Sequence, residues 1–466
     1  MSTDELLWSG ASAQAAALRE GSVTAPELLE AVLARLEAVE PQLNAFRRVD
    51  AEGARAAARA AQERLDAGER TPLLGVPVAV KDDADVAGDP TGFGGRAQFP
   101  PPAADAAFIA RLREAGAVLV GRTNVPERCI WPFTETLTRG ATRNPWSLDH
   151  TPGGSSGGSG AAVAAGVVGL ATASDGGGSI RIPAAFCGLL GHKPTRDLVP
   201  LDPVEEVWNG LSVYGALSPT VADTAAFLDV CARDGDPAEG PPAGSYRAAV
   251  AADPAPLRIA LAWRGPAGPS PIERRRRAAV AQTAERLRSL GHEVVERELP
   301  IPPAAVPAFL VRFLRGAADD IATLPHPEWL DRRSRGMWRM GRAIPDGVLE
   351  RATALHARVA RDLLAFFDDV DVVLQPSLVG RPWRIGAFQR RGGLTTTLAV
   401  ALRLPTLPVW NALGYPATSV PVGLDDERLP MAVQLVAPPG EDRRLLALAA
   451  QLERQDPWSA RRPTAV

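Results

Sequence analysis

Lysine is almost missing from this chain of 466 residues. Of its 51 lysine and arginine residues, only Lys81 and Lys193 are lysine. Arginine stays protonated in proteins, whereas a buried lysine amine can become neutral and accept a proton. A biased genomic base composition would also replace lysine by arginine, so scarcity alone assigns no role. It does direct attention to the surroundings of the two lysines that remain.

Cysteine, net charge and long apolar runs are also scarce, and each absence removes a class of protein. The three cysteines are odd in number and scattered, which argues against a disulfide framework or a zinc site. A net charge of -3 gives no electrostatic case for nucleic-acid binding. The longest apolar run, residues 161–173, is too short to cross a bilayer, and the acidic opening is unlike a signal peptide. We therefore expect a cytoplasmic protein without a membrane segment or bound metal.

Lys81 lies where a buried strand is expected to end. It closes the apolar run 73–80, and Asp82 and Asp83 follow it directly. Such a run predicts a buried strand that delivers the amine to its polar end. Lys193, by contrast, precedes a proline in an expected turn, so Lys81 is the better candidate for a base.

Two blocks rich in glycine and serine follow, at residues 153–160 and 174–183. The first precedes a small-residue helix expected over 161–168, and the second follows a plausible strand over 167–173. A glycine-rich loop that opens a helix exposes backbone N–H groups, and consecutive glycines can aim several of them at one point. This is how an oxyanion hole is built.

Four chemistries use loops of this kind. A phosphate-binding P-loop needs a lysine that neither block contains, and the dinucleotide fingerprint is incomplete in both, so a nucleotide-binding protein is a weak alternative. Residues 153–157 match the G-x-S-x-G elbow of α/β-hydrolases, which would make Ser155 the nucleophile and require a late histidine. A serine activated by lysine through a second serine needs only Lys81, Ser155 and Ser179, which occur in that order.

These motifs resemble the amidase signature family, and the resemblance covers most of the chain. The stretches that carry it are 77–82, 121–127, 131–135, 143–146, 153–160, 174–188, 215–223, 411–421 and 429–436. Two stretches depart from the common pattern: Gly177 replaces a threonine or another larger residue, and 195–199 lacks a usual glycine. Neither departure indicates loss of activity. The sequence also argues against a catalytically inactive protein that keeps only the fold, because all three candidate catalytic residues are retained.

The resemblance implies a role for each site residue. Ser179 is the expected nucleophile, Ser155 the bridging serine after a cis bond from Gly154, and Lys81 the general base. The expected oxyanion donors are the amides of Gly176, Gly177, Gly178 and Ser179. Ser156 is expected to support the lysine network, and Asp175 and Arg181 to fix the nucleophile loop, although plain packing is the stronger interpretation for Arg181. No metal or organic cofactor is implied.

The predicted fold is α/β, with one large mixed β-sheet flanked by helices on both faces. The expected regions are 1–70, a helical N-terminal part; 71–232, the first part of the core; 233–369, a connecting segment, strand-helix-strand and helical substrate-entrance region; and 370–466, the return to the core. Such a chain would act on its own as a monomer or homodimer.

Specificity is the least determined property. The pocket candidates are Cys129, Ile130, Trp131, Trp208 and Trp383, and for each tryptophan core packing is an equal alternative. Ten tryptophans against three tyrosines favour an apolar slot, and hence aryl or aliphatic amides, with carbamates and esters as secondary substrates. The main rival role is the amidase subunit of a glutamine-dependent tRNA amidotransferase.

Overall fold

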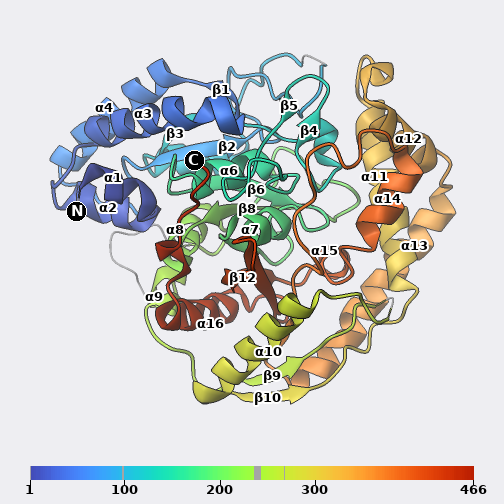
Figure 1. The fold of residues 1–466 in the computed structure, drawn as a ribbon. Coiled ribbons are helices and arrows are strands. Elements are labelled where there is room, and N and C mark those ends of the chain that lie inside the picture. The colour runs from blue at the N-terminus through green and yellow to red at the C-terminus, as the bar shows by residue number, and fades with distance from the viewer. Residues whose placement is uncertain (1, 97–98, 236–242, 267) are drawn as a thin grey trace.

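One large mixed β-sheet organises the molecule, as predicted. The computed structural model describes residues 2–96, 99–235, 243–266 and 268–466, and Figure 1 shows their arrangement. Eleven strands hydrogen-bond in the order β1-β3-β2-β6-β8-β7-β12-β13-β11-β9-β10, and helices flank the sheet on both faces. The sheet is mixed: the pairs from β6 to β11 in this order are antiparallel, whereas β3-β2-β6 on one side and β11-β9-β10 on the other are parallel.

The strands of the large sheet are β1 Phe46–Val49, β2 Pro77–Lys81, β3 Val118–Thr123, β6 Ala171–Asp175, β7 Leu190–Lys193, β8 Val213–Ser218, β9 Arg258–Leu261, β10 Glu293–Glu296, β11 Val372–Pro376, β12 Ala417–Leu424 and β13 Pro430–Val436, and a separate pair joins β4 Glu135–Thr136 to β5 Gly140–Ala141.

The α-helices are α1 Thr3–Trp8, α2 Ala11–Arg19, α3 Ala25–Leu43, α4 Ala51–Asp66, α5 Ala107–Glu114, α6 Gly157–Ala164, α7 Arg181–Cys187, α8 Val221–Cys231, α9 Tyr246–Val250, α10 Arg274–Ser289, α11 Ala305–Ala322, α12 Arg332–Arg342, α13 Asp346–Asp362, α14 Gly393–Ala401, α15 Pro408–Leu413 and α16 Asp442–Gln455. Short 3-10 turns are η1 Glu127–Cys129, η2 Pro327–Trp329, η3 Leu363–Asp368 and η4 Trp458–Ala460.

The N-terminal region contributes a strand to the sheet as well as helices. Helix α3 begins with a capping box between Thr24 and Glu27. Between α3 and α4, however, β1 pairs antiparallel with β3 and forms one edge of the sheet. The N-terminal region is therefore continuous with the core sheet.

The middle region also joins the sheet. Strands β9 and β10, with α10 between them, form the opposite edge, where β9 pairs parallel with β11. The expected connecting segment 234–256 contains α9, and its residues 236–242 lie outside the described part. Helices α11 to α14 pack together beside the sheet, far from α3 and α4 (Figure 1).

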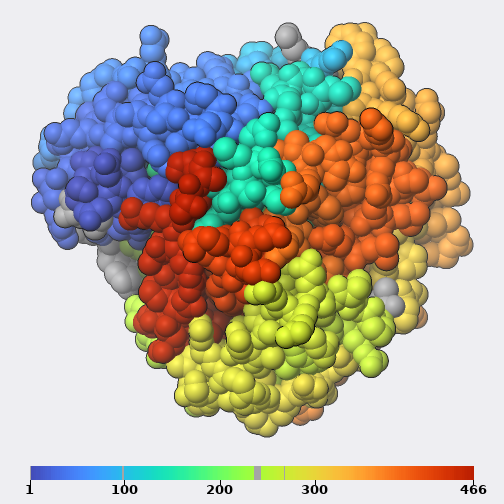
Figure 2. All heavy atoms as spheres, in the orientation of Figure 1, coloured from blue at the N-terminus to red at the C-terminus, as the bar shows by residue number. Residues whose placement is uncertain are grey.

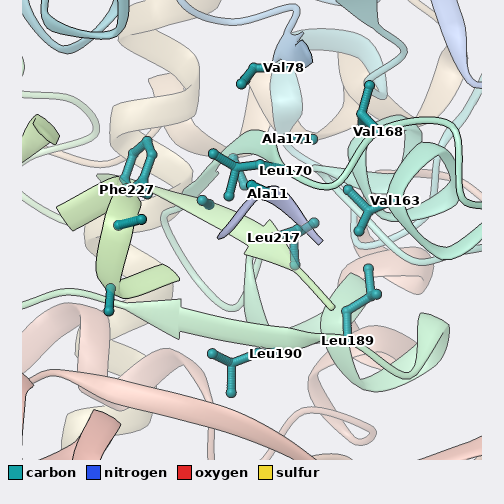
Figure 3. Packing of buried hydrophobic residues seen from close by; sticks show 14 of the residues in the cluster. Ala11, Val78, Val163, Val168, Leu170, Ala171, Leu189, Leu190, Leu217 and Phe227 are labelled. Atoms are coloured by element: carbon teal, nitrogen blue, oxygen red, sulfur yellow. The ribbon is translucent and has the colours of Figure 1, made fainter. Parts of the chain in front are cut away.

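Small and branched apolar side chains fill the space between the sheet and its helices. In Figure 3, Val78 of β2, Ala171 of β6 and Leu217 of β8 lie close to Leu170 and Phe227. Each of these side chains is at most 1 % exposed. Burying one such large side chain contributes roughly 1.5–3 kcal/mol, so this core fixes the strands whose ends carry the site residues.

The C-terminal segment fills the middle of the molecule. In the space-filling view its red atoms lie between the blue N-terminal region and the yellow region around α10 (Figure 2). Among the helices that the structure describes, none is long and apolar enough to cross a membrane.

Candidate active site

Lys81 is completely buried at the end of β2, and its amine contacts three oxygen atoms. Its Nζ donates to Ser155 Oγ at 2.8 Å and to Ser174 Oγ at 2.6 Å. A carboxylate oxygen of Asp83 lies 2.9 Å from the same Nζ. The backbone N–H of Lys81 donates to Thr172 Oγ1, which ties β2 to β6 below the amine.

Asp83 and Ser174 are members of this cluster that sequence reasoning did not identify. Ser174 accepts from Lys81 and donates to Asp83 Oδ2 at 2.5 Å, so the three side chains form a closed set of contacts. Their positions carried a weak signal: Asp83 lies two residues after Lys81, and Ser174 immediately precedes Asp175. Only the pairing of β2 and β6 in the sheet brings them together.

Ser155 follows a cis peptide bond from Gly154, as the resemblance implies. A side chain at Gly154 would meet backbone atoms of Trp131 and Phe133 at 2.6 Å, so this position is restricted to glycine.

The expectation that residues 153–160 form a loop before a helix over 161–168 was partly wrong. Helix α6 already begins at Gly157, because close packing favours glycine there despite its poor helix propensity.

Ser156 supports the cluster indirectly. Its hydroxyl accepts from the Ser174 backbone N–H at 3.4 Å and donates to the Ser174 carbonyl at 3.3 Å. It therefore holds the backbone of the residue that contacts Lys81.

The loop after β6 is fixed by a buried ion pair. Arg181 donates to both oxygens of Asp175, at 3.0 Å each, and both residues are fully buried. Burial alone would raise the pKa of Asp175, but the Arg181 guanidinium and hydrogen bonds outweigh it and hold that pKa well below its usual range.

Two residues from the C-terminal region complete this network. Asn411 donates to Asp175 and accepts from Arg181, and Gln434 accepts from Arg181 at 2.8 Å. A buried ion pair is favourable only when its remaining hydrogen bonds are satisfied. The loop that carries Ser179 therefore depends on residues more than 200 positions further along the chain.

The four expected oxyanion donors are not equivalent. The Gly178 N–H donates to Asp175 Oδ1 at 2.6 Å, so this amide serves to hold the loop and is removed from the expected set. Gly177 and Ser179 line an apolar cavity, whereas Gly176 faces a second cavity beside Trp208. Threonine at Gly177 would crowd the ring of Phe309, which lies 3.1 Å from the position of an added Cβ.

Two cavities meet at the serine cluster. The first has a volume of about 280 Å³ and is lined mainly by apolar side chains; those that matter here are Ile130, Trp131, Phe309, Phe313, Met337 and Val400. Helices α11, α12 and α14 supply four of these six side chains. The second cavity, about 360 Å³, contains Ser155, Ser174 and several acidic residues in its wall.

The five predicted pocket residues separate into three groups. Ile130 and Trp131 line the apolar cavity, and Cys129 lies between the two cavities. Trp208 lines the second cavity. Trp383 lines neither: its ring packs edge-on against Phe133, Phe186 and Phe388, the alternative of core packing that the sequence left open.

Lys193 lies at the end of β7, fully buried, and donates to the Pro194 carbonyl. Burial, followed by the charge of Arg181, lowers its pKa to about 7. It lines neither cavity, so of the two lysines only Lys81 contacts the serines.

The histidines of the later half have partners elsewhere. His292 bonds to Gln451, and His356 bonds to the Ala305 carbonyl beside Arg312. His326 is half-exposed and pairs with Glu328. Each is therefore occupied away from Ser155, which argues against the G-x-S-x-G interpretation. Within the described ranges, no cluster of histidine, cysteine or acidic side chains could hold a metal ion.

The stretch 195–199, which departs from the common family pattern, is held in place by hydrogen bonds to the C-terminal region. Thr195 donates to the Asp442 carboxylate through its backbone at 2.8 Å and through its hydroxyl at 2.5 Å, and His192 contacts the same carboxylate. Arg196 donates to the carbonyls of Asn411 and Ala412. Asn411 is therefore shared between this loop and the network around Asp175.

Comparison with known proteins gives a consistent result. The family model described as "Amidase" matches residues 27–446. Across the full length of both chains, this chain is 48% identical to "Putative amidase AmiB2" of Mycobacterium tuberculosis. It is 35% identical to a glutamyl-tRNA(Gln) amidotransferase subunit from Roseiflexus castenholzii, with 96% of this chain and 95% of the relative covered.

A solved structure gives the same result in three dimensions. The structure of 6-aminohexanoate cyclic dimer hydrolase complexed with substrate superposes with a TM-score of 0.86. The two chains are 30% identical, and the match covers 98% of this chain and 99% of the other.

Proposed function

The chain belongs to the amidase family and is an amide-hydrolysing enzyme, and from that premise we propose that it works through a Ser179 acyl-enzyme. The observation that carries the proposal is the buried contact of 2.8 Å between Lys81 Nζ and Ser155 Oγ. A serine hydroxyl is a weak nucleophile until a base removes its proton. Lys81 is the base in reach of Ser155, and Ser179 lies in the wall of the adjoining cavity.

The cycle has two halves. Ser179 Oγ attacks the amide carbon, and its proton passes through the Ser155 hydroxyl to a neutral Lys81. The proton then returns through Ser155 to the leaving nitrogen as the C–N bond breaks. Water hydrolyses the ester on Ser179 by the same relay, which regenerates the free serine.

The developing oxyanion is stabilised by backbone amides of the glycine loop. We assign this role to the N–H groups of Gly177 and Ser179, whose residues line the first cavity, and we keep Gly176, which lines the second, as a further candidate donor. One essential donor of this kind contributes about 3 kcal/mol to the transition state in other acyl-transfer enzymes. The ion pair between Asp175 and Arg181 holds these amides in place.

For the substrate, we propose small aryl or aliphatic amides, with carbamates and esters as secondary substrates. The apolar lining of the first cavity supports an aryl or alkyl acyl group, and all three compound classes present the same carbonyl. Turnover of matched anilide, alkyl amide, carbamate and primary amide compounds tests this preference. Hydrolysis of the primary amide alone would overturn it.

A role as the amidase component of a tRNA amidotransferase is the second candidate function, because one relative with that name is 35% identical over nearly the whole chain. Such a component works with partners. Steady turnover of a simple amide by the purified chain alone would argue against this role, whereas activity only in the presence of partner proteins would favour it.

We also propose that the enzyme works in the cytoplasm as a monomer or homodimer. Its three cysteines are all buried and unpaired, as is usual in a reducing compartment. Light scattering of the purified chain would measure the oligomeric state, and a stable higher assembly would contradict the proposal.

The first experiment is the intact mass of the protein after treatment with a fluorophosphonate, which reacts covalently with an activated serine. We expect one adduct on the wild type, none on Ser179→Ala, and slow formation on Ser155→Ala because its relay is broken. An adduct that persists in Ser179→Ala but is lost in Ser155→Ala would assign the nucleophile to Ser155 instead.

A further inference from the structure

We infer that the second cavity binds the amine side of the substrate and selects amines that carry a positive charge. This inference rests on the proposed serine mechanism and adds the substrate class to it. It predicts amides that join an apolar acid to a cationic amine.

The positions of the two serines fix which cavity receives which half of the amide. Ser155 lines the second cavity, whereas Ser179 and Gly177 line the first. Because the proton returns to the leaving nitrogen through Ser155, that nitrogen must lie on the Ser155 side. The amine group therefore extends into the second cavity, and the acyl group occupies the apolar cavity.

The wall of the second cavity is predominantly acidic. Its charged members are Asp83, Asp85, Arg128, Glu206, Asp319 and Asp320. Arg128, the single basic residue in this described wall, pairs with Asp320 through Nε and Nη2 and lies over the ring of Phe93 at 4.2 Å, while its Nη1 is buried without a hydrogen-bond partner. The charge that remains toward the cavity is therefore negative.

Basic residues behind the wall do not cancel this charge completely. Arg315 pairs with Asp319 and with Asp346, and Lys81 pairs with Asp83. Arg196 and Arg312 lie near Glu206 but donate to backbone carbonyls. None of these four basic residues is in the cavity wall, so the charged groups that line it are, apart from Arg128, carboxylates.

Asp83 gives an independent indication that a donor belongs in this cavity. Its side chain is only 9% exposed and lines the cavity, yet its Oδ1 accepts no hydrogen bond. A buried carboxylate oxygen without a donor is costly, and such groups are usually satisfied. An ammonium or amide N–H from the substrate would supply the missing donor.

The test compares four amides of similar length. N-(6-aminohexyl)hexanamide carries the charge on the amine side, and N-hexyl-6-aminohexanamide carries it on the acyl side. N-heptylhexanamide is the neutral counterpart, and N-(5-carboxypentyl)hexanamide is the anionic one. We expect kcat/KM to be highest for the first compound. It should exceed the value for the anionic compound by about tenfold, as a tenfold difference in binding of the amine group would produce. High salt should reduce the difference.

A pair of double variants locates the effect. Asp85→Asn with Glu206→Gln removes two cavity carboxylates, and Asp369→Asn with Glu285→Gln removes two exposed carboxylates that lie outside the wall. We expect the ratio of cationic to anionic turnover to fall several-fold in the cavity variant and to stay unchanged in the surface variant. Inhibition of the wild type by free 1,6-diaminohexane, compared with heptylamine, gives the same comparison without any variant.

The outcomes separate the inference from the mechanism. Equal turnover of all four amides, a preference for charge on the acyl side, or an unchanged ratio in the cavity variant would overturn the inference alone. A fluorophosphonate adduct on Ser179 without turnover of the first amide would also overturn it. Absence of both adduct and turnover would instead count against the proposed serine mechanism.

Discussion

At the scale of single residues, the amine of Lys81 is the centre of the site. Three oxygen atoms, from Ser155, Ser174 and Asp83, surround it within 3 Å, and the residue is fully buried. Two hydroxyls that line the second cavity contact this amine, and because that of Ser174 donates to Asp83, the Ser155 hydroxyl is the one that we propose as the proton route.

The first prediction concerns the chemical identity of this base. Lys81→Arg keeps the positive charge but cannot supply a neutral amine, because arginine stays protonated. We expect kcat to fall by at least about a thousandfold, within the range typical for loss of a general base. The measurement is steady-state hydrolysis of an anilide, with circular dichroism and thermal unfolding to verify that the variant is folded. A folded Lys81→Arg enzyme with a tenth of the normal rate would rule out Lys81 as the base.

Some contacts of the candidate site could be predicted from the sequence, and others could not. Lys81 and Ser155 meet as expected because a strand end and a glycine loop are local features. Asp83 was overlooked because its contact with Ser174 forms only when β6 lies beside β2. Gly178 was misassigned because an amide in a glycine run can point in several directions, and only the position of Asp175 determines which.

At the scale of elements, helix α6 shows how packing overrides local propensity. Its first turn contains three glycines, Gly157, Gly158 and Gly160, which are poor helix formers. A Cβ at Gly158 would come within 2.4–2.6 Å of backbone atoms of Ala45 and Asn124, so the helix can approach these segments only without a side chain.

The second prediction compares two glycines of this helix. Gly158→Ala forces backbone atoms apart, and we expect it to lower the free energy of unfolding by about 2 kcal/mol or more. Gly160→Ala is the matched control, because its Cβ would meet the Pro183 Cβ at 3.1 Å, and we expect a much smaller change. Urea unfolding measures both. Equal effects would show that helix propensity, rather than close approach, decides these positions.

Other elements show why sequence patterns were not sufficient. The strand β1 was not predicted, because it is four residues long and lies between two alanine-rich helices. Its residues become a strand by pairing with β3, which the local sequence does not reveal. By contrast, the β9-α10-β10 unit was predicted, since each element carries its own apolar pattern.

Two acidic residues, the buried Asp223 and the half-buried Glu453, join the N-terminal helices to α16. Asp223 caps α8 and accepts from the backbone N–H of Ser12, and Glu453 accepts from Val221. Burial raises the pKa of Asp223 to about 6 and that of Glu453 to about 8. Both groups are therefore more easily protonated in the folded state than in the unfolded one.

The third prediction follows from the sign of these shifts. A carboxyl with a raised pKa contributes stability below its unfolded pKa, and this contribution is lost as pH rises through the folded pKa. We expect Glu453 to lower stability between about pH 5 and pH 8, at up to about 1.4 kcal/mol per pH unit. Glu453→Gln should flatten this dependence, as measured by denaturant unfolding across the range. A variant with the wild-type slope would contradict the assignment.

At the scale of the whole molecule, segments far apart in sequence alternate within one sheet. Strand β7 lies between β8 and β12, so the first and last parts of the chain share a continuous hydrogen-bonded surface. The two core parts, 71–232 and 370–466, are therefore one structural unit even though the middle region separates them in the sequence.

The fourth prediction tests this unity. A fragment of residues 1–232 contains Lys81, Ser155 and Ser179 but lacks β12 and β13. We expect it to show no cooperative thermal transition and no fluorophosphonate adduct, whereas the full chain should show both. The measurements are calorimetry and intact mass. A fragment that unfolds cooperatively would mean that the first 232 residues form an independent domain.

The dependence of Asp175 and Arg181 on Asn411 and Gln434 also has a consequence for synthesis of the protein. A ribosome that has made the first 400 residues has already released the three proposed catalytic side chains from its exit tunnel. The loop that aims Ser179 still lacks the partners that hold it. We therefore expect a nascent or prematurely terminated chain to be catalytically silent, so that the cell gains hydrolytic activity only with nearly complete molecules.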